Sequence, residues 1–268
     1  MDMKFHTLGA IFLVLLLTCL TAAPSRAQDQ EEKMAVKSGF GFEIFSRTLS
    51  WDEDKYTSRV LSYFGILDLK FELHRGLFLS ALVGYSSSNF NGLTFRQLPF
   101  SVTFEDQGGV VNGYLVGAEI NQKVYEKLDS YEIGLLAQFV LYSGIKKSWE
   151  ITDLNEPGIL EGKPHWMRAM VGPVFCYKGY EYWSPYIFIH YNKLWGKFEL
   201  TETIVDLVGT EEKKISGKSV LGLSIGTMYE PSSRFLIKGE VTLLPFDKGN
   251  NDGLGIDLGG MVKAIFTF

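Results

Sequence analysis

The feature that most constrains the fold of this chain is a two-residue alternation of apolar and polar side chains over long segments. Within residues 60–73 the two parities differ in chemistry: one carries Leu61, Tyr63, Leu67, Leu69, Phe71 and Leu73, and the other carries Ser62, Asp68, Lys70 and Glu72. Successive side chains of a β-strand point to opposite faces, so such a segment has one apolar and one polar face. The alternation recurs at 237–243 and 254–268. The chain is therefore predicted to be all-β.

The alternating segments are longer than ordinary strands. Most contain 11 to 15 residues, whereas strands of soluble proteins contain about 5–6 residues and a tilted strand needs about 9–11 to cross a bilayer. After residue 30, no stretch approaches the roughly 18 apolar residues that a membrane helix requires. The ten segments are 38–49, 59–73, 77–87, 110–123, 130–143, 166–178, 185–199, 218–229, 235–245 and 254–268.

The connections between these segments alternate between short and long. Membrane-spanning β-barrels have short turns at one end and longer loops at the other. Ten strands, with both chain ends on the short-turn side, reproduce that division at every connection. The short connections are 74–76, 124–129, 179–184 and 230–234, and the long ones are 50–58, 88–109, 144–165, 200–217 and 246–253.

Two further stretches leave eight or twelve strands possible. Residues 98–104 and 200–208 also alternate. Counting both as strands gives twelve, but the long 144–165 connection then falls on the short-turn side. We therefore expect both stretches to extend hairpins beyond the membrane. The predicted fold is a closed antiparallel up-and-down transmembrane β-barrel of about ten strands.

The first 27 residues have the layout of a secretory signal peptide. Lys4 supplies a positive charge, residues 8–20 are apolar, and Ser25, Arg26 and Ala27 end in small residues suited to cleavage. The alternative is a lipoprotein acylated at Cys19, although Thr18 is larger than the residue usual before such a cysteine. We predict export, with residues 28–37 as a polar periplasmic tail and 38–268 as the barrel.

The last residues carry a family resemblance. Residues 262–268 alternate and end in phenylalanine, and they resemble the C-terminal signal of bacterial outer-membrane β-barrel proteins. The matching positions are Phe268, Phe266 and Ala264, and Ala264 is smaller than the apolar residue usual there. The resemblance implies that this segment closes the barrel and is recognised by the barrel-assembly machinery. It also implies a monomer in the outer membrane, surrounded by lipid and lipopolysaccharide.

Strand parity predicts which side chains enter the lumen. In lipid every backbone N–H and C=O must be paired, so the sheet must close, with apolar side chains outward. The predicted inward residues are Glu43, Arg47, Asp68, Lys70, Glu72, Glu119, Lys123, Glu132, Gln138, Arg168, Lys178, His190, Asn192, Lys238, Glu240, Asp257 and Lys263. Acids and bases nearly balance, so a structural ion-pair network that plugs a narrow barrel is expected. The alternative is a narrow polar pore, for which Gly222, Ser224 and Gly226 leave local room.

Aromatic side chains are expected near both water boundaries of a membrane barrel. The candidates for these girdles, near segment ends or on the lipid face, are Tyr63, Tyr85, Tyr131, Trp166, Tyr191, Trp195 and Tyr229. Ordinary strand-forming aromatics are the alternative reading of the same positions.

Few residues point to chemistry. A net charge of −5 argues against nucleic acid as a partner. His74 is predicted in a short turn, His165 in an external loop and His190 in the lumen, and none has a serine or acid at a recognisable spacing. Cys176 is predicted to fill space, since one cysteine in the mature chain forms no internal disulfide. No catalytic residue, cofactor or metal site is predicted.

Two charged loop clusters have an alternative reading. Residues 51–54 (Trp51, Asp52, Glu53 and Asp54) form an acidic tip that could hold a divalent cation, but they lack the regular alternation of a calcium loop. Lys146 and Lys147 could pair with lipopolysaccharide phosphates. Solvated loops are the preferred interpretation of both.

Three classes of function follow. The favoured one is a structural or surface-interaction barrel that acts through its external loops. The first alternative is a narrow porin-like channel for small solutes or ions. The second is an outer-membrane enzyme acting on lipid or peptide, and a soluble exported β protein is the last.

Overall fold

The computed structural model describes residues 36–51, 56–74, 76–105, 108–127, 130–151, 158–248 and 253–268. The predicted signal peptide and most of the predicted tail lie outside this part of the chain, as does Asp52–Asp54 of the acidic tip. The described residues include no helix long and apolar enough to cross a membrane. The strands are β1 (Val36–Trp51), β2 (Tyr56–His74), β3 (Leu77–Asn91), β4 (Thr94–Phe95), β5 (Val102–Thr103), β6 (Val110–Lys127), β7 (Tyr131–Gly144), β8 (Lys147–Ile151), β9 (Gly158–Tyr177), β10 (Trp183–Ile204), β11 (Leu207–Gly217), β12 (Leu221–Ser232), β13 (Phe235–Asp247) and β14 (Leu254–Thr267).

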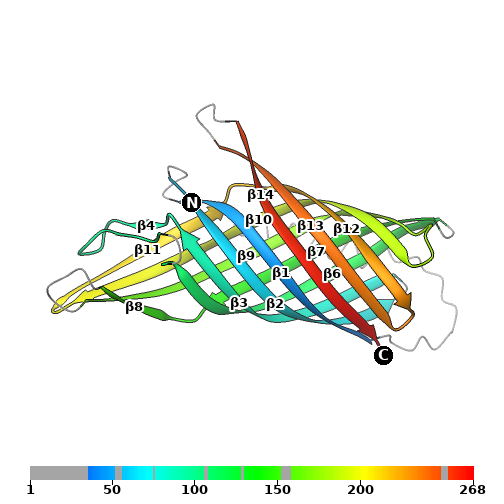
Figure 1. Ribbon diagram of the computed structural model, residues 1–268, viewed down its shortest axis with the longest axis horizontal. Helices are drawn as coiled ribbons and strands as arrows, with labels where there is room; N and C mark the ends of the chain where they lie inside the picture. Colours follow the sequence, from blue (N-terminus) through cyan, green and yellow to red (C-terminus); the bar gives the residue numbers. More distant parts are fainter. Residues whose placement is uncertain are drawn as a thin grey trace. The chain divides into compact units, whose positions relative to one another are not determined.

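Ten of these strands close into a ring (Figure 1). The order is β1, β2, β3, β6, β7, β9, β10, β12, β13 and β14, and each neighbour is antiparallel. The first and last strands close it: β1 pairs with β14 from Lys37 opposite Thr267 to Phe45 opposite Gly259. The N–H of Phe268 also donates to the carbonyl of Val36 at 3.1 Å. The predicted barrel and its ten strands are confirmed.

The two extra alternating stretches extend hairpins, as predicted. Residues 200–204 continue β10 and pair with β11, and β4 pairs with β5 inside the connection between β3 and β6. β8 pairs with the first residues of β9. Figure 1 shows β4, β8 and β11 together at one end of the ring, the end that carries the long connections.

Different strands form the wall of the barrel toward that end. β14 pairs with β1 only as far as Phe45, and β11 pairs with β1 at residues 49–51. β10 changes partner in the same way: it pairs with β12 as far as Tyr191 and with β11 from Trp195 onward. β11 therefore replaces β12, β13 and β14 in the wall, and a seam lies where the exchange takes place.

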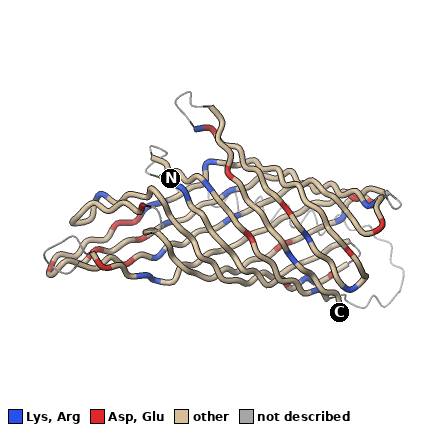
Figure 2. Tube along the Cα trace, in the orientation of Figure 1, with Lys and Arg blue, Asp and Glu red and all other residues tan. Residues whose placement is uncertain are grey.

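The two faces of the wall differ in chemistry. Phe42, Ile189 and Val262 are typical of the outward side chains, which are large, apolar and exposed. Charged residues are interspersed along the strands that form the ring (Figure 2). Those in the middle of the strands, such as Asp68 and Lys263, are buried. A surface of exposed apolar residues around a buried charged interior is the inverse of a soluble core and is what lipid requires.

Candidate functional site in the barrel lumen

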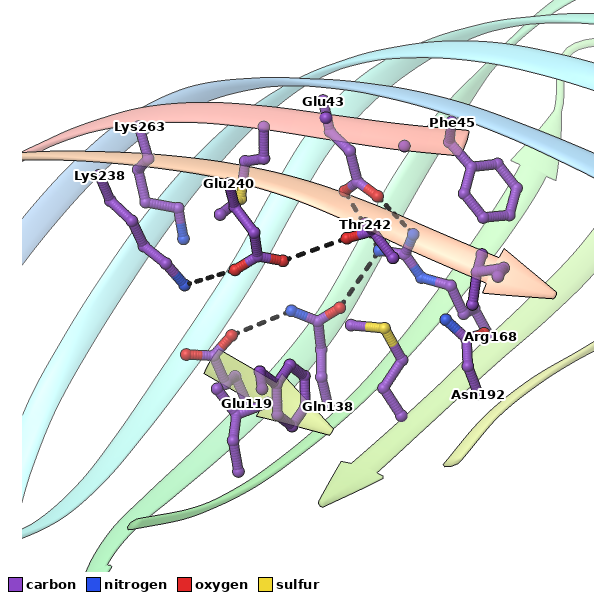
Figure 3. Close-up of a pocket in the computed structure, with 17 residues that line it drawn as sticks. Glu43, Phe45, Glu119, Gln138, Arg168, Asn192, Lys238, Glu240, Thr242 and Lys263 are labelled. Atoms are coloured by element: carbon purple, nitrogen blue, oxygen red, sulfur yellow. Dashed lines mark hydrogen bonds and ion pairs between the residues drawn. The ribbon is translucent and has the colours of Figure 1, made fainter. Parts of the chain in front are cut away.

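A charged layer crosses the middle of the lumen (Figure 3). The Arg168 guanidinium on β9 forms an ion pair with the Glu43 carboxylate on β1, through both Nη1 and Nη2. Arg168 Nη2 also donates to Gln138 Oε1 at 3.2 Å, and Gln138 Nε2 donates to Glu119 Oε2 at 2.9 Å. One chain of contacts thus joins β1, β9, β7 and β6 across the interior.

Glu240 on β13 organises the opposite side of this layer. Its carboxylate accepts from the Tyr186 hydroxyl at 2.6 Å and from Thr242 Oγ1 at 3.3 Å, and it forms an ion pair with Lys238 at 3.2 Å. The Lys238 ammonium also lies 4.9 Å from the Tyr186 ring centroid. A buried charge is tolerated when it is paired and its remaining acceptors are satisfied, and Glu240 meets both conditions.

A third ion pair lies toward the short-turn end. Lys263 Nζ is 2.7 Å from Asp68 Oδ2, and both side chains are buried. Lys70 is close enough to interact electrostatically with Glu119 and Asp68, and its ammonium lies 5.2 Å from the Phe78 ring centroid. The predicted inward residues are therefore brought together by the ring, with bases facing acids.

Two small cavities adjoin this layer. The first, of about 60 Å³, is lined by Glu43, Arg168, Glu240 and Lys263 among others. The second, of about 100 Å³, is lined by residues that include Asn121, Glu132 and Tyr186. A water molecule needs roughly 10–15 Å³ of such space, so each cavity has room for several waters.

The lumen is apolar on the long-loop side of the charged layer. One inward position beyond Glu43 and Arg168 along their strands lie Phe45 and Trp166, whose rings are 5.7 Å apart and nearly parallel. Tyr142 stacks on Trp166 at 3.7 Å, and Phe64 packs against both rings at 5.0 and 6.1 Å. All four side chains are buried. We call these four residues the aromatic layer.

The aromatic layer corrects two sequence predictions. Its position in the sequence makes Trp166 a candidate for a membrane girdle, yet it has the same parity as Arg168 and points into the lumen. The rule of polar residues inward and apolar residues outward also fails in this half of the barrel. Lipid dictates only the outward side chains, and a narrow lumen can be filled by rings packed as in a soluble core.

Residues 92–105, which we call the mouth loop, cover the aromatic layer from outside. The loop contains β4 and β5, and its Phe95 and Phe104 rings pack around Phe198 of β10 at 5.6 and 5.5 Å. Two buried carboxylates hold its backbone. Glu202 Oε2 accepts from the Phe100 N–H at 2.8 Å, and Glu211 Oε2 accepts from the Gln97 N–H at 2.7 Å. No local sequence pattern predicts either anchor.

Polar side chains close the seam where β11 replaces β14. Arg47 is fully buried and donates to Asn192 Oδ1 at 2.9 Å and to the Ser219 carbonyl at 2.6 Å. Its Nε lies 4.0 Å from Asp257 Oδ2. Asp257 also accepts from the backbone N–H and the hydroxyl of Thr48, both at 2.8 Å. Side-chain bonds here take the place of the interrupted strand ladder.

The short-turn end carries the remaining predicted residues. Glu132 forms ion pairs with Lys123, at 3.0 Å, and with Lys178. Glu72 Oε1 accepts from the Gly76 N–H at 3.4 Å in the β2–β3 turn. Of the C-terminal residues, Ala264 lies opposite Phe40 of β1, Phe266 packs on Phe235 at 5.0 Å, and Phe268 is exposed.

Known proteins resemble this chain only at the level of the fold. No protein-family model matches the chain, and no curated protein matches its sequence. The transport unit of the autotransporter AIDA-I from Escherichia coli is 13% identical, over 94% of this chain and 97% of that one, with a TM-score of 0.42. The attachment invasion locus protein Ail of Yersinia pestis is 12% identical over 88% and 99%, with a TM-score of 0.34. The toluene transporter TodX of Pseudomonas putida is 9% identical over 93% and 92%, with a TM-score of 0.32. At these values no conclusion about activity follows.

The geometry of the chain itself meets the requirements of lipid. The ring leaves no open edge between β1 and β14, and its outward face is a broad surface of exposed apolar side chains. A closed antiparallel barrel with that surface, short turns at one end and long connections at the other is the architecture of bacterial outer membranes. The chain has the fold of a membrane-spanning β-barrel.

Within this barrel, two histidines contact serines that the sequence spacing did not suggest. His190 Nε2 lies 3.2 Å from Ser224 Oγ in the lumen, and His165 Nδ1 lies 3.2 Å from Ser143 Oγ on the outer wall. Each pair joins two strands that are neighbours in the sheet, so only the fold brings its members together. Within the described residues neither histidine has an acidic hydrogen-bond partner on its other nitrogen, which a catalytic base requires for orientation.

The glycines expected to leave room in the lumen are filled. A Cβ on Gly222 would lie 2.3 Å from His190 Cε1, and one on Gly226 would lie 2.4 Å from the Tyr186 hydroxyl. Glycine is needed there because these larger side chains occupy the space. The prediction that Gly222 and Gly226 leave open space was therefore wrong.

The remaining candidate residues are buried or make contacts within the barrel. Cys176 is buried, and no group of three or more potential metal ligands occurs among the described residues. Lys146 and Lys147 have partners within the protein: Lys146 pairs with Glu161 at 2.6 Å, and Lys147 donates to the Val110 carbonyl at 2.8 Å.

Proposed function

We propose that this protein is a closed, non-conducting outer-membrane barrel whose role is to present its external structure at the cell surface. The observation that carries the proposal is the aromatic layer. Phe45, Phe64, Tyr142 and Trp166 come from β1, β2, β7 and β9, so their rings meet across the lumen instead of lining one wall. Stacked rings in van der Waals contact fill this part of the lumen, so we expect no path for hydrated ions.

The external end supports a surface role. The strands β8, β9, β10 and β11 pair in register beyond the level of the aromatic layer, and the mouth loop packs on them through Phe95 and Phe104. Rigid external hairpins with a buried apolar interior are preorganised for binding, because little conformational entropy is lost when a partner docks. The outer-membrane partners that we propose are lipid and lipopolysaccharide around the wall and the barrel-assembly machinery during insertion, with a monomer as the folded form.

A narrow channel is the alternative that one observation favours. The charged layer and the two cavities of about 60 and 100 Å³ give the short-turn half of the lumen a polar, water-sized interior. In this alternative the aromatic layer and mouth loop would have to move for solutes to pass. An enzyme is the remaining alternative, and the Ser143–His165 contact is its best candidate pair.

Liposome swelling separates the closed barrel from the channel. Liposomes containing the folded protein are placed in isotonic solutions of sugars of graded size, and light scattering reports uptake. We expect no uptake for the wild-type protein and measurable uptake of the smallest sugars for the Phe45→Ala/Trp166→Ala variant. Uptake by the wild-type protein itself would overturn the proposal and favour the channel.

A further inference from the structure

The outer wall has a sharp chemical boundary near the long-loop end. On β7, β9 and β10 the outward side chains change at this level from the apolar Leu141, Met167 and Trp195 to polar residues, and the next apolar outward residue of β9 is Ile159 near its start. The next outward positions toward the long loops are Ser143, His165 and Lys197, which are direct neighbours in the sheet. Tryptophan at such a boundary is typical of the membrane interface, so these polar side chains lie at the level of the lipid headgroups.

Basic side chains gather at this boundary. Lys197 has His165 of β9 on one side and Lys214 of β11 on the other, and Lys163 is the next outward residue of β9. Lys193, below Trp195, extends toward the boundary and donates to Ser216 Oγ at 3.1 Å. A lysine that reaches from the apolar wall toward water in this way marks the interface. We call Lys163, His165, Lys193, Lys197 and Lys214 the basic cluster.

The acids nearby do not neutralise the cluster. Glu212 forms an ion pair with Lys197 at 2.6 Å, and Glu199 lies opposite Lys163 in the sheet. In the described part of the chain, neither Lys163 nor Lys214 forms an ion pair, and both are exposed. Glu161, the next outward residue of β9 after Lys163, is already paired with Lys146 at 2.6 Å. Four lysines therefore face the two remaining glutamates, which leaves a positive surface next to the apolar wall.

The ionisation of His165 reflects the same surroundings. Partial burial, together with the charges of Lys163 and Lys197, lowers the pKa of His165, and Glu199 opposes the shift. An anion bound at this place would favour the protonated imidazole and raise the pKa again.

We infer that the basic cluster binds the phosphate groups of an outer-leaflet lipid headgroup. Lysine ammonium groups are strong point-charge partners for phosphate. The neighbouring Trp195 and Met167 face the acyl chains, so one ligand with phosphates above and hydrocarbon below satisfies both parts of the surface. This inference deepens the lipid partnership in the proposed function by assigning its residues, and it is independent of whether the lumen conducts.

The test compares two matched double variants. Lys163→Gln/Lys214→Gln removes the two lysines without ion pairs, and Lys146→Gln/Lys147→Gln removes two external lysines that already have partners in the protein. Both variants and the wild type are folded in detergent, and the heat-dependent shift on gels confirms folding. Binding of lipid A carrying two phosphates is then measured, with dephosphorylated lipid A and inorganic phosphate as comparison probes.

We expect the Lys163→Gln/Lys214→Gln variant to bind bisphosphorylated lipid A at least about tenfold more weakly than the wild type, and the control variant to bind within about twofold. The wild type should bind dephosphorylated lipid A as weakly as the first variant does. Equal binding by wild type and first variant, or an equal loss in the control, would overturn the inference. Displacement of the lipid by an equal concentration of inorganic phosphate would show that free phosphate, and not the lipid headgroup, is the ligand. The liposome-swelling experiment tests only whether the lumen is closed. Either proposal can therefore fail while the other stands.

Discussion

Glu43 and Arg168 are 125 residues apart in the sequence and form a two-point ion pair across the lumen, with 3.1 Å between Arg168 Nη2 and Glu43 Oε2. The guanidinium also lies 5.2 Å from the Phe45 ring centroid. The pair therefore sits at the junction of the charged layer and the aromatic layer. It ties β1, which closes the ring, to the strand on the opposite wall.

Replacing one member of this pair is expected to be costly. Glu43→Gln leaves the buried Arg168 without its counter-charge, which typically destabilises a protein by about 3–5 kcal/mol. Urea unfolding in lipid vesicles, followed by tryptophan fluorescence, measures the change. The double variant Glu43→Leu/Arg168→Met removes both charges and should recover most of the loss. A single variant as stable as the wild type would mean that the pair contributes no net stability.

The seam should depend on Asp257. Asp257→Asn weakens the contacts to Arg47 and Thr48 that replace the strand ladder, and bonds to a charged group contribute about 1.5–3 kcal/mol each. We expect a loss of about 2–4 kcal/mol and faster amide exchange at residues 46–48. Glu230→Gln, at an exposed position near the end of β12, is the control and should change stability by less than about 0.5 kcal/mol. Similar exchange rates in both variants would argue against a seam held by Asp257.

The mouth loop should loosen when its anchors are removed. Glu202 is fully buried and holds the Phe100 N–H, so Glu202→Ala removes a charge-assisted bond and leaves that N–H unpaired. Amide exchange at residues 97–104 is expected to accelerate by about ten- to a hundredfold, while the ring strands keep their protection. Glu199→Ala, on the outward face of the same strand, is the matched control. Acceleration throughout the barrel would indicate global destabilisation instead of a local anchor.

The C-terminal phenylalanine is predicted to serve assembly and not stability. Phe268 is 83% exposed, so Phe268→Ser removes little packing from the folded barrel. We expect severalfold less folded protein in cells, measured by the heat-dependent gel shift, and unchanged refolding of purified protein into vesicles. Leu254→Ser, at an exposed position near the other end of β14, is the control. Equal yields of the two variants in cells would remove the basis for an assembly signal at Phe268.

Strand parity was enough to predict the ring and the inward charges. Asp68, Lys70 and Glu72 alternate with lipid-facing leucines, and the same rule assigned Glu240 and Lys263 to the interior. Parity does not say how far along the barrel a residue lies, nor which inward side chains meet across it. For that reason the aromatic layer was missed, although Trp166 shares the parity of Arg168. The anchors at Glu202 and Glu211, the insertion of β11 and the Ser143–His165 contact all join residues distant in sequence, and no local pattern encodes such contacts.

The most direct test of the closed barrel is its conductance in a planar lipid bilayer. Folded wild-type protein, checked for the heat-dependent gel shift before use, is inserted into the bilayer and current is recorded at both voltage polarities. The aromatic layer predicts no stepwise current from the wild type. Reproducible unitary steps from correctly folded wild-type protein would contradict a lumen sealed by Phe45, Phe64, Tyr142 and Trp166.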